Sequence, residues 1–600
     1  GSGIADVTDN TVSCYYVQNT NGNWDNTSSW KNTIVPRSVN NARIKAQSTI
    51  AQNQTIKNLI LNTGSQVDIN SSISLNVTDD ITNNSQFTGN GEVILNGTAN
   101  QELSGNGAYE NLRLNNGKGA SVTGSTDITG VLSVDNGTFA TNNSVTFPCS
   151  FDDDNTNNID EYRVGQVGKV KSNGSVSGNV TVQICVPANR AFRFLASSVN
   201  TKNSSKPYIY DNWQQGRLEP GDNGYRPNIG TDITGGLKSD GFDQNASGNP
   251  SLYTFDNATG SYTAVSTANN LATKGPNGLS LKTGKPYYML VRGDRRINLL
   301  VNDRPKGIDT KLEATGSLAV GDLTTVDVTT TGPNGYILIS NPYQAPVKLD
   351  KVLAHSTNTS ANTNVWVWDP QAGSGFSKGQ FALIQSDGTK SLMSSSANRI
   401  LQPGQSVFVK ASTVDNLVQV NFRESDKVGS SRLTDIFSND SNLNLDGFLR
   451  IGLYPSGFTP FTDVAKDGFI VKFDDSFNNA VDQQDGAKTS ASAENMTLKL
   501  NDEYLSINSR KLPKKLSEVI NIYTYFINDK GKYTNLKGSE YTLAIELQGL
   551  QDLPNGVMLW DKYKDSYTKL SDQQTITFNV DQSIPESKAN DRFALVFENE

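Results

Sequence analysis

The amino-acid sequence predicts an all-β protein: a short parallel β-solenoid at the N-terminus, followed by two β-sandwich domains of the jelly-roll or immunoglobulin-like kind. Three observations lead to this prediction. Short apolar pairs recur near the start of the chain at an interval of about 16 to 20 residues. The composition favours turns and exposed β structure, with 51 glycines and only 19% charged residues. Finally, no long run shows the 3.6-residue period of an amphipathic helix.

The regular spacing lies in residues 42–148, which we assign to the solenoid. In each pair, two aliphatic residues flank one other residue, as in a strand with one buried face. A single coil cannot bury its inward side chains alone, so coils would stack about 4.8 Å apart and share a core. Two ordinary antiparallel sheets are the alternative. The pairs are Leu59 and Leu61, Leu75 and Val77, Val93 and Leu95, Leu112 and Leu114, and Leu132 and Val134.

The length of the chain predicts several domains, because 600 residues are too many for one hydrophobic core. Residues 1–41 precede the repeats and form an N-terminal cap segment. After the solenoid, residues 149–430 contain strand-like runs separated by long turn clusters, which predicts a β-sandwich with long loops. The alternation resumes in residues 431–600, which predicts a C-terminal β-sandwich.

Charge and hydropathy exclude two classes of partner. The formal net charge is −8, and the few short basic patches do not make the surface that nucleic acid requires. No run of 18 apolar residues occurs, so the sequence predicts no transmembrane segment. We therefore expect neither nucleic acid nor a membrane-spanning helix.

The chain has three cysteines, Cys14, Cys149 and Cys185. Cys149 and Cys185 bracket a hairpin-like stretch and can pair in an oxidising compartment, which leaves Cys14 unpaired. Buried free thiols are the alternative. A zinc site is not expected, because the chain has no Cys-x-x-Cys motif and its only histidine is His355.

Three tryptophans are candidate ligand-binding residues: Trp24, Trp30 and Trp213. An indole can stack its apolar face on a sugar ring while its N–H makes a hydrogen bond. Trp24 and Trp30 have a second interpretation, which we favour. They would plug the open end of the solenoid, whose first coil otherwise exposes its core.

An acidic loop is a candidate calcium site. Asp152, Asp154, Thr156 and Asp160 place oxygen ligands at alternate positions, as a hard cation requires. The loop lacks the glycine at the sharp turn of an EF-hand and has no flanking helices. A solvated loop between domains is therefore the alternative, and calcium is the only cofactor that we consider.

Catalytic motifs are weak throughout the chain. Asp474 with Asp475, and Asp482 with Asp485, are carboxylate pairs of the kind that glycoside hydrolysis needs. Their surroundings resemble turns, where aspartate is common for structural reasons. The tripeptide at 292–294, Arg-Gly-Asp, suggests adhesion through an integrin, but it directly follows an apolar run, where its arginine and aspartate fit a structural role in pairing or capping a turn. We predict that the protein is not an enzyme.

A series of short motifs after residue 186 carries a family resemblance. The motifs, in chain order, cover residues 186–195, 212–214, 288–295, 339–343, 365–370, 404–409, 422–425 and 591–597. Together they resemble the C-terminal region of surface proteins that Bacteroidota export by the type IX secretion system, including adhesin-like and gliding-associated members. The resemblance covers about 160 to 600. Such proteins continue into a sorting domain, which would begin where the printed sequence stops, at Glu600.

The resemblance implies an extracellular or cell-surface location on the outer-membrane side, with the type IX secretion machinery as a partner during export. Combined with the repeats, it predicts a non-catalytic adhesin, stalk or matrix component that binds polysaccharide or another surface ligand. Self-assembly into an extracellular filament is the first alternative, since solenoid ends and sandwich edges can associate. A polysaccharide-active enzyme is the second alternative.

Overall fold

The structure is a computed structural model. It describes residues 14–152, 161–188, 190–215, 218–300, 308–330, 335–360, 362–370, 379–393, 395, 397–428, 447–482, 484–489, 493–511, 519–527, 532–550 and 556–597. The chain is mostly β, with 49% strand and 5% helix. Within these ranges no helix is long and apolar enough to cross a bilayer.

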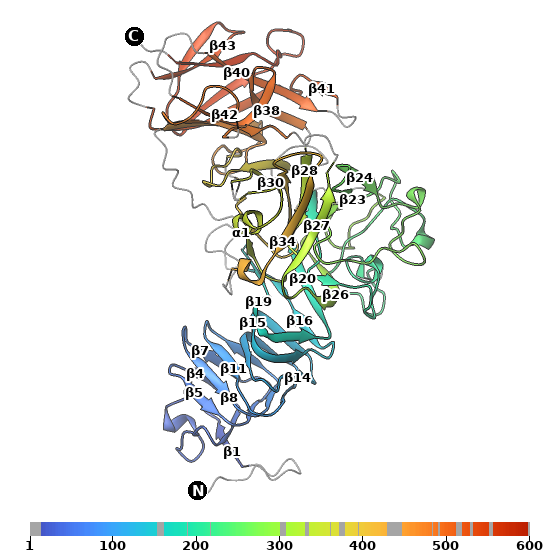
Figure 1. The fold of residues 1–600 in the computed structure, drawn as a ribbon, viewed down its shortest axis with the longest axis vertical. Helices are drawn as coiled ribbons and strands as arrows, with labels where there is room; N and C mark the ends of the chain where they lie inside the picture. The colour runs from blue at the N-terminus through green and yellow to red at the C-terminus, as the bar shows by residue number, and fades with distance from the viewer. Residues whose placement is uncertain are drawn as a thin grey trace.

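The elements follow a long axis, with the N-terminal strands at one end and the C-terminal sheet at the other (Figure 1). A loop-rich segment, residues 201–286, lies to one side (Figure 1). The N-terminal strands are β1 (Tyr15–Gln18), β2 (Gly22–Asn23), β3 (Asn41–Ile44), β4 (Gln47–Ile50), β5 (Gln54–Ile56), β6 (Leu59–Leu61), β7 (Gln66–Ile69), β8 (Ser74–Val77), β9 (Ile81–Asn83), β10 (Gln86–Thr88), β11 (Glu92–Leu95), β12 (Gln101–Ser104), β13 (Gly107–Asn115), β14 (Ala120–Val122), β15 (Thr126–Ala140) and β16 (Val145–Phe147).

The middle of the chain contains the only α-helix of the described residues, α1 (Leu349–Ala354). Its strands are β17 (Cys149–Asp152), β18 (Glu161–Val164), β19 (Gln166–Ser177), β20 (Asn179–Val186), β21 (Ala191–Leu195), β22 (Val199–Asn200), β23 (Leu252–Asp256), β24 (Ser261–Ala264), β25 (Tyr287–Val291), β26 (Thr310–Leu318), β27 (Leu323–Thr329), β28 (Tyr336–Ser340), β29 (Val347–Lys348), β30 (Val365–Asp369), β31 (Gln380–Ile384), β32 (Ile400–Leu401), β33 (Ser406–Lys410) and β34 (Leu417–Phe422).

The C-terminal strands form one sheet of 12 strands. They are β35 (Gly447–Pro455), β36 (Asp467–Phe473), β37 (Gly486–Ala487), β38 (Ala493–Leu500), β39 (Glu503–Arg510), β40 (Val519–Ile527), β41 (Tyr533–Thr534), β42 (Glu540–Gln548), β43 (Val557–Asp561), β44 (Ser566–Lys569), β45 (Gln574–Asn579) and β46 (Phe593–Phe597).

The predicted fold class is wrong beyond its β content. The structure consists of curled, half-barrel sheets and not of a short solenoid followed by two sandwiches. The first large sheet has 20 strands and does not stop near residue 148. It continues because β15 pairs with β19 and β16 with β20, after which β20 turns the sheet antiparallel by pairing with β26. The last N-terminal strands therefore do not leave an open sheet edge, because strands from the middle of the chain pair with them.

The short N-terminal strands pair in parallel with strands about one repeat further along the chain. β4 pairs with β7, β7 with β10, and β10 with β13, each with like positions opposed. The predicted aliphatic pairs lie in such strands and point inward, where the alternate residues are fully buried. Their burial supplies the main driving force for this part of the sheet.

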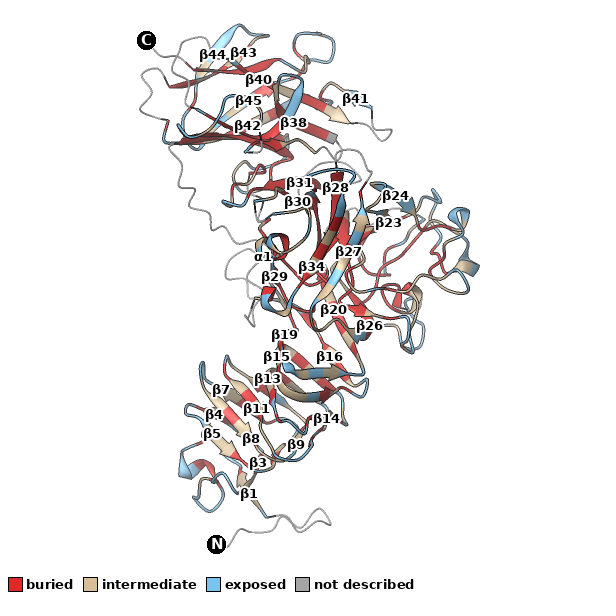
Figure 2. Ribbon diagram, in the orientation of Figure 1, coloured by how far each residue is buried: buried red, intermediate tan, exposed pale blue. Residues whose placement is uncertain are grey.

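The C-terminal sheet is antiparallel except where β36 runs parallel to β39. One side chain in two points into the sheet's own core, which includes Leu498, Ile522, Leu559 and Leu595. The other side chains face away from this core, and along the edge strand β44 most residues are exposed (Figure 2). By contrast, β36 is buried at every position, because the outer face of this part of the sheet, which includes Ile470, packs against Leu383 of the middle strands.

Candidate aromatic binding surface

The three candidate tryptophans are buried, which corrects their assignment as ligand-binding residues. Trp24, Trp30 and Trp213 have exposed fractions of 1%, 2% and 0%. Trp30 Nε1 donates to the Trp24 carbonyl oxygen at 2.7 Å, and the two rings meet edge to face. Trp213 packs edge to face against Tyr287. The apolar area of an indole favours the core, so no ring face is left for a sugar.

Most of the candidate calcium loop lies outside the described residues, including Asp154, Thr156 and Asp160. Asp152 is the last residue of β17, where it pairs with Glu161 of β18. In the described part of the chain, no group of three or more histidine, cysteine, aspartate or glutamate residues is placed to hold a metal.

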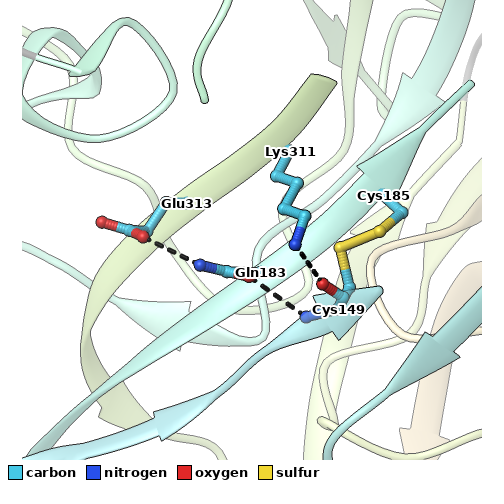
Figure 3. Close-up of a disulfide and its surroundings, with 5 residues drawn as sticks. All are labelled: Cys149, Gln183, Cys185, Lys311 and Glu313. Atoms are coloured by element: carbon cyan, nitrogen blue, oxygen red, sulfur yellow. Dashed lines mark hydrogen bonds between the residues drawn. A yellow bond between two sulfur atoms is a disulfide. The ribbon is translucent and has the colours of Figure 1, made fainter. Parts of the chain in front are cut away.

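Cys149 and Cys185 form a disulfide across 36 residues of sequence, whereas Cys14 is an exposed free thiol. Polar groups surround the disulfide (Figure 3). The Cys149 N–H donates to Gln183 Oε1 at 3.1 Å, and Lys311 Nζ donates to the Cys149 carbonyl oxygen at 2.5 Å. The bond therefore joins β17 to β20 inside a network that satisfies the backbone of Cys149.

The carboxylate pairs are used within turns. Asp474 accepts hydrogen bonds from the N–H and the hydroxyl of Ser476, and these bonds lower the pKa of Asp474. Asp485 accepts from the backbone N–H groups of Asp482 and Ser509, while burial raises the pKa of Asp485. Such bonds are those that aspartate makes in structural turns.

The Arg-Gly-Asp tripeptide is also internal. Arg292 and Asp294 are both buried. Asp294 accepts hydrogen bonds from Arg296 Nε and from the Asn228 N–H, each at 2.7 Å. Burial lowers the pKa of Arg292 to about 10. A partner protein therefore cannot reach the side chains of this tripeptide.

The outward face of the C-terminal sheet instead carries a row of aromatic and polar residues. Residues directly opposite each other in paired antiparallel strands lie on the same face of the sheet. The registers of β44, β43, β46, β40, β38 and β39 place six residues in one row that crosses the sheet. In spatial order they are Tyr567, Trp560, Ala594, Asn521, Lys499 and Tyr504.

One end of the row is a stacked aromatic pair. The rings of Trp560 and Tyr567 are nearly parallel, at 6°, with centroids 5.6 Å apart. Tyr567 is 50% exposed. Lys562 lies beside the pair, with Nζ 5.8 Å from the Trp560 ring, and donates to Asn521 Oδ1 at 3.0 Å. This end combines an exposed aromatic surface with hydrogen-bonding groups.

The other end is a cluster of four tyrosines. Tyr504 lies 5.5 Å from Tyr523 and 6.2 Å from Tyr525, and Tyr525 lies 5.2 Å from Tyr533. Tyr504 and Tyr533 are 37% and 61% exposed. Lys499 Nζ lies within 6 Å of the Tyr504 and Tyr523 rings. We call the row together with this cluster the aromatic face.

The charges on the aromatic face are mixed. Lys499 forms an ion pair of 3.1 Å with Asp502, and this hydrogen bond raises the pKa of Lys499. Lys562 contributes a second cation near the centre of the row. The face therefore offers ring surfaces with ammonium and amide donors between them, an arrangement suited to a ligand that has both apolar faces and hydroxyl groups.

Sequence reasoning missed these residues. The contributing residues lie up to 95 positions apart in sequence, between Lys499 and Ala594, and only the strand register brings them together. A local signal was present in β40, where the half-buried Tyr523 lies between the buried Ile522 and Thr524, although Tyr525 is buried as well. That pattern points to one partly exposed aromatic ring, Tyr523, on this strand.

In comparisons with known proteins, no protein-family model, no curated protein and no solved structure matches the chain.

Proposed function

We propose that this protein is a non-catalytic, exported surface or extracellular protein that binds polysaccharide through the aromatic face. The observation that carries the proposal is the cross-strand row with exposed aromatic rings at both ends. Large exposed aromatic patches are uncommon on soluble proteins and indicate interaction surfaces.

The spacing of the row suits an extended chain of sugars. Four strand-to-strand steps separate Trp560 on β43 from Tyr504 on β39, which corresponds to about 19 Å at about 4.8 Å a step. A polysaccharide that crosses the strands would contact an aromatic ring at each end. Between them, Asn521, Lys499 and Lys562 can make hydrogen bonds to hydroxyl groups.

Two further observations support export. The Cys149–Cys185 disulfide is the kind of bond that persists in an oxidising, extracytoplasmic environment. The resemblance of residues 160–600 to surface proteins of the type IX secretion system points to the same location, and to that machinery as the partner during export. An adhesin or matrix component would use the aromatic face where it meets a glycan.

Truncation of the aromatic face is expected to weaken polysaccharide binding. Trp560→Ala and Tyr504→Ala should each lower the affinity about tenfold, because each removes a ring surface worth more than about 1 kcal/mol. Binding would be found by a glycan array and measured by calorimetry on the full chain. Tyr262→Ala is the matched control, since Tyr262 is 45% exposed but lies on β24, outside the aromatic face.

The outcomes are separable. Loss of binding in the two aromatic-face variants, with Tyr262→Ala unchanged, supports the proposal. The absence of any polysaccharide ligand overturns it, and so does a Trp560→Ala protein that binds as tightly as the unaltered chain. Thermal unfolding of each variant shows whether the fold is retained.

A further inference from the structure

A ladder of mostly polar side chains runs across the parallel strands of the first large sheet, far from the aromatic face. The parallel registers of β4, β7, β10, β13, β15 and β16 stack equivalent positions about 4.8 Å apart. These positions point outward, because their neighbours in each strand are buried. In order, they are Gln47, Gln66, Gln86, Ala108, Asp127 and Thr146.

The glutamines of this ladder bond to one another and to nearby hydroxyls. Gln86 Nε2 donates to Gln66 Oε1 at 3.2 Å, and Gln66 Nε2 donates to Thr88 Oγ1 at 2.8 Å. Ala108 interrupts the ladder, because its methyl group cannot span the space between Gln86 and Asp127. The ladder therefore has a notch of one side chain in width.

The notch is a shallow depression, wide open to solvent, with a volume of about 310 Å³. This volume is near the lower end of ligand pockets, which run from about 300 to 1,000 Å³. Small and polar residues line the cavity, and no lysine or arginine is among them. They are Ser85, Gln86, Asn106, Gly107, Ala108, Ser125 and Asp127.

Asp127 has unused hydrogen-bonding capacity at this cavity. Among the described residues, none donates a hydrogen bond to its carboxylate or pairs with it. Burial alone raises the pKa of Asp127, without an opposing cation. Asn106, which also lines the depression, is held in place because its Oδ1 accepts from the Ser125 N–H at 3.1 Å. The cavity thus presents a carboxylate acceptor close to amide and hydroxyl groups.

This chemistry selects a small, neutral ligand rich in hydroxyls. A carboxylate accepts from two adjacent hydroxyls, while an amide can both donate and accept. An anion would be repelled by Asp127 and would find no cation. A calcium ion prefers six to eight oxygen ligands with several carboxylates, and the cavity provides one carboxylate. We propose that the notch at Ala108 is a second carbohydrate site, which holds one neutral sugar unit between Gln86 and Asp127.

Filling the notch provides the test. Ala108→Gln continues the glutamine ladder and should abolish saturable binding of neutral methyl glycosides, with at least a tenfold loss of affinity. Saturation-transfer NMR on the full chain would measure it. Asp68→Asn is the matched control, because Asp68 lies on the same face of β7 but already accepts from Thr88 Oγ1 at 3.0 Å.

Each outcome decides the matter. Methyl glycoside binding that is lost in Ala108→Gln and kept in Asp68→Asn supports the second site. The site is overturned if no neutral methyl glycoside binds, if only calcium binds, or if Ala108→Gln binds like the unaltered chain. Trp560→Ala should leave these signals intact, so failure here is distinct from failure at the aromatic face.

Asp127 should also make stability depend on pH. Its raised folded-state pKa means that the ionised carboxylate is penalised in the fold, so the stability present at acidic pH is lost as the pH rises through that pKa. Asp127→Asn should therefore raise the melting temperature at pH 7 by one or a few degrees and change it little at pH 3. Calorimetric melting at both pH values measures the effect, and a variant that is less stable at pH 7 would mean that the carboxylate has a stabilising partner.

Discussion

Replacing Cys149 and Cys185 together by alanine is expected to lower the free energy of unfolding by about 3 to 4 kcal/mol. The disulfide closes a loop of 36 residues, and the chain-entropy model assigns about this value to a loop of that length. Both cysteines are buried, and alanine keeps the site apolar. Urea denaturation followed by fluorescence would measure the change, and limited proteolysis should show earlier cleavage between the two positions.

The free thiol supplies the control. Cys14 is exposed and unpaired, so Cys14→Ala should leave the unfolding curve within about 0.5 kcal/mol of the unaltered protein. If the double alanine variant also stays within that range, the disulfide does not constrain the unfolded chain in the way that the model assumes.

Asp467→Ala is expected to destabilise the C-terminal sheet by about 3 to 5 kcal/mol. Asp467 begins β36, and both of its carboxylate oxygens accept from Lys488 Nζ. Its Oδ2 also accepts from the Met496 N–H at 2.8 Å. The two charged side chains are each only 2% exposed, so removal of the carboxylate leaves a buried ammonium group without its counter-charge.

Two comparisons isolate that effect. The double variant Asp467→Leu with Lys488→Met should recover most of the lost stability, because replacing a whole buried pair by apolar residues is often close to neutral. Asp502→Asn removes the charge of an exposed pair with Lys499, keeps a residue type that tolerates the left-handed backbone at this position, and should change the unfolding curve little. Equal costs for Asp467→Ala and Asp502→Asn in urea denaturation would contradict the assigned role of burial.

The sequence predicted strands where local alternation is strong. Leu59 with Leu61, and Val93 with Leu95, lie in β6 and β11 with their side chains buried. Alternation shows which face of a strand is apolar, but not which strand lies next to it. The pairings of β15 with β19 and of β20 with β26 join distant segments, and these pairings turn the expected separate modules into continuous curled sheets.

The candidate surface was harder to predict for a related reason. From sequence alone Trp213 is a candidate for ligand contact, and Trp24 and Trp30 share that interpretation beside the favoured one of plugging the solenoid end, yet all three are internal. The residues next to a single tryptophan in the sequence do not show whether its ring is exposed, because exposure depends on tertiary packing. Trp560 and Tyr504 face solvent together because the registers of five paired strands align them.

The position of the disulfide has a mechanical consequence. β1 and the C-terminal sheet lie at opposite ends of the molecule, and β20, which carries Cys185 of the disulfide, lies between them (Figure 1). If tension is applied along the long axis, the segment between Cys149 and Cys185, which are 36 positions apart, cannot be pulled straight, and about 120 Å of extended chain length stays closed off by the disulfide. Under load, this junction would act as a covalent stop, and a reducing environment would convert it into extensible slack.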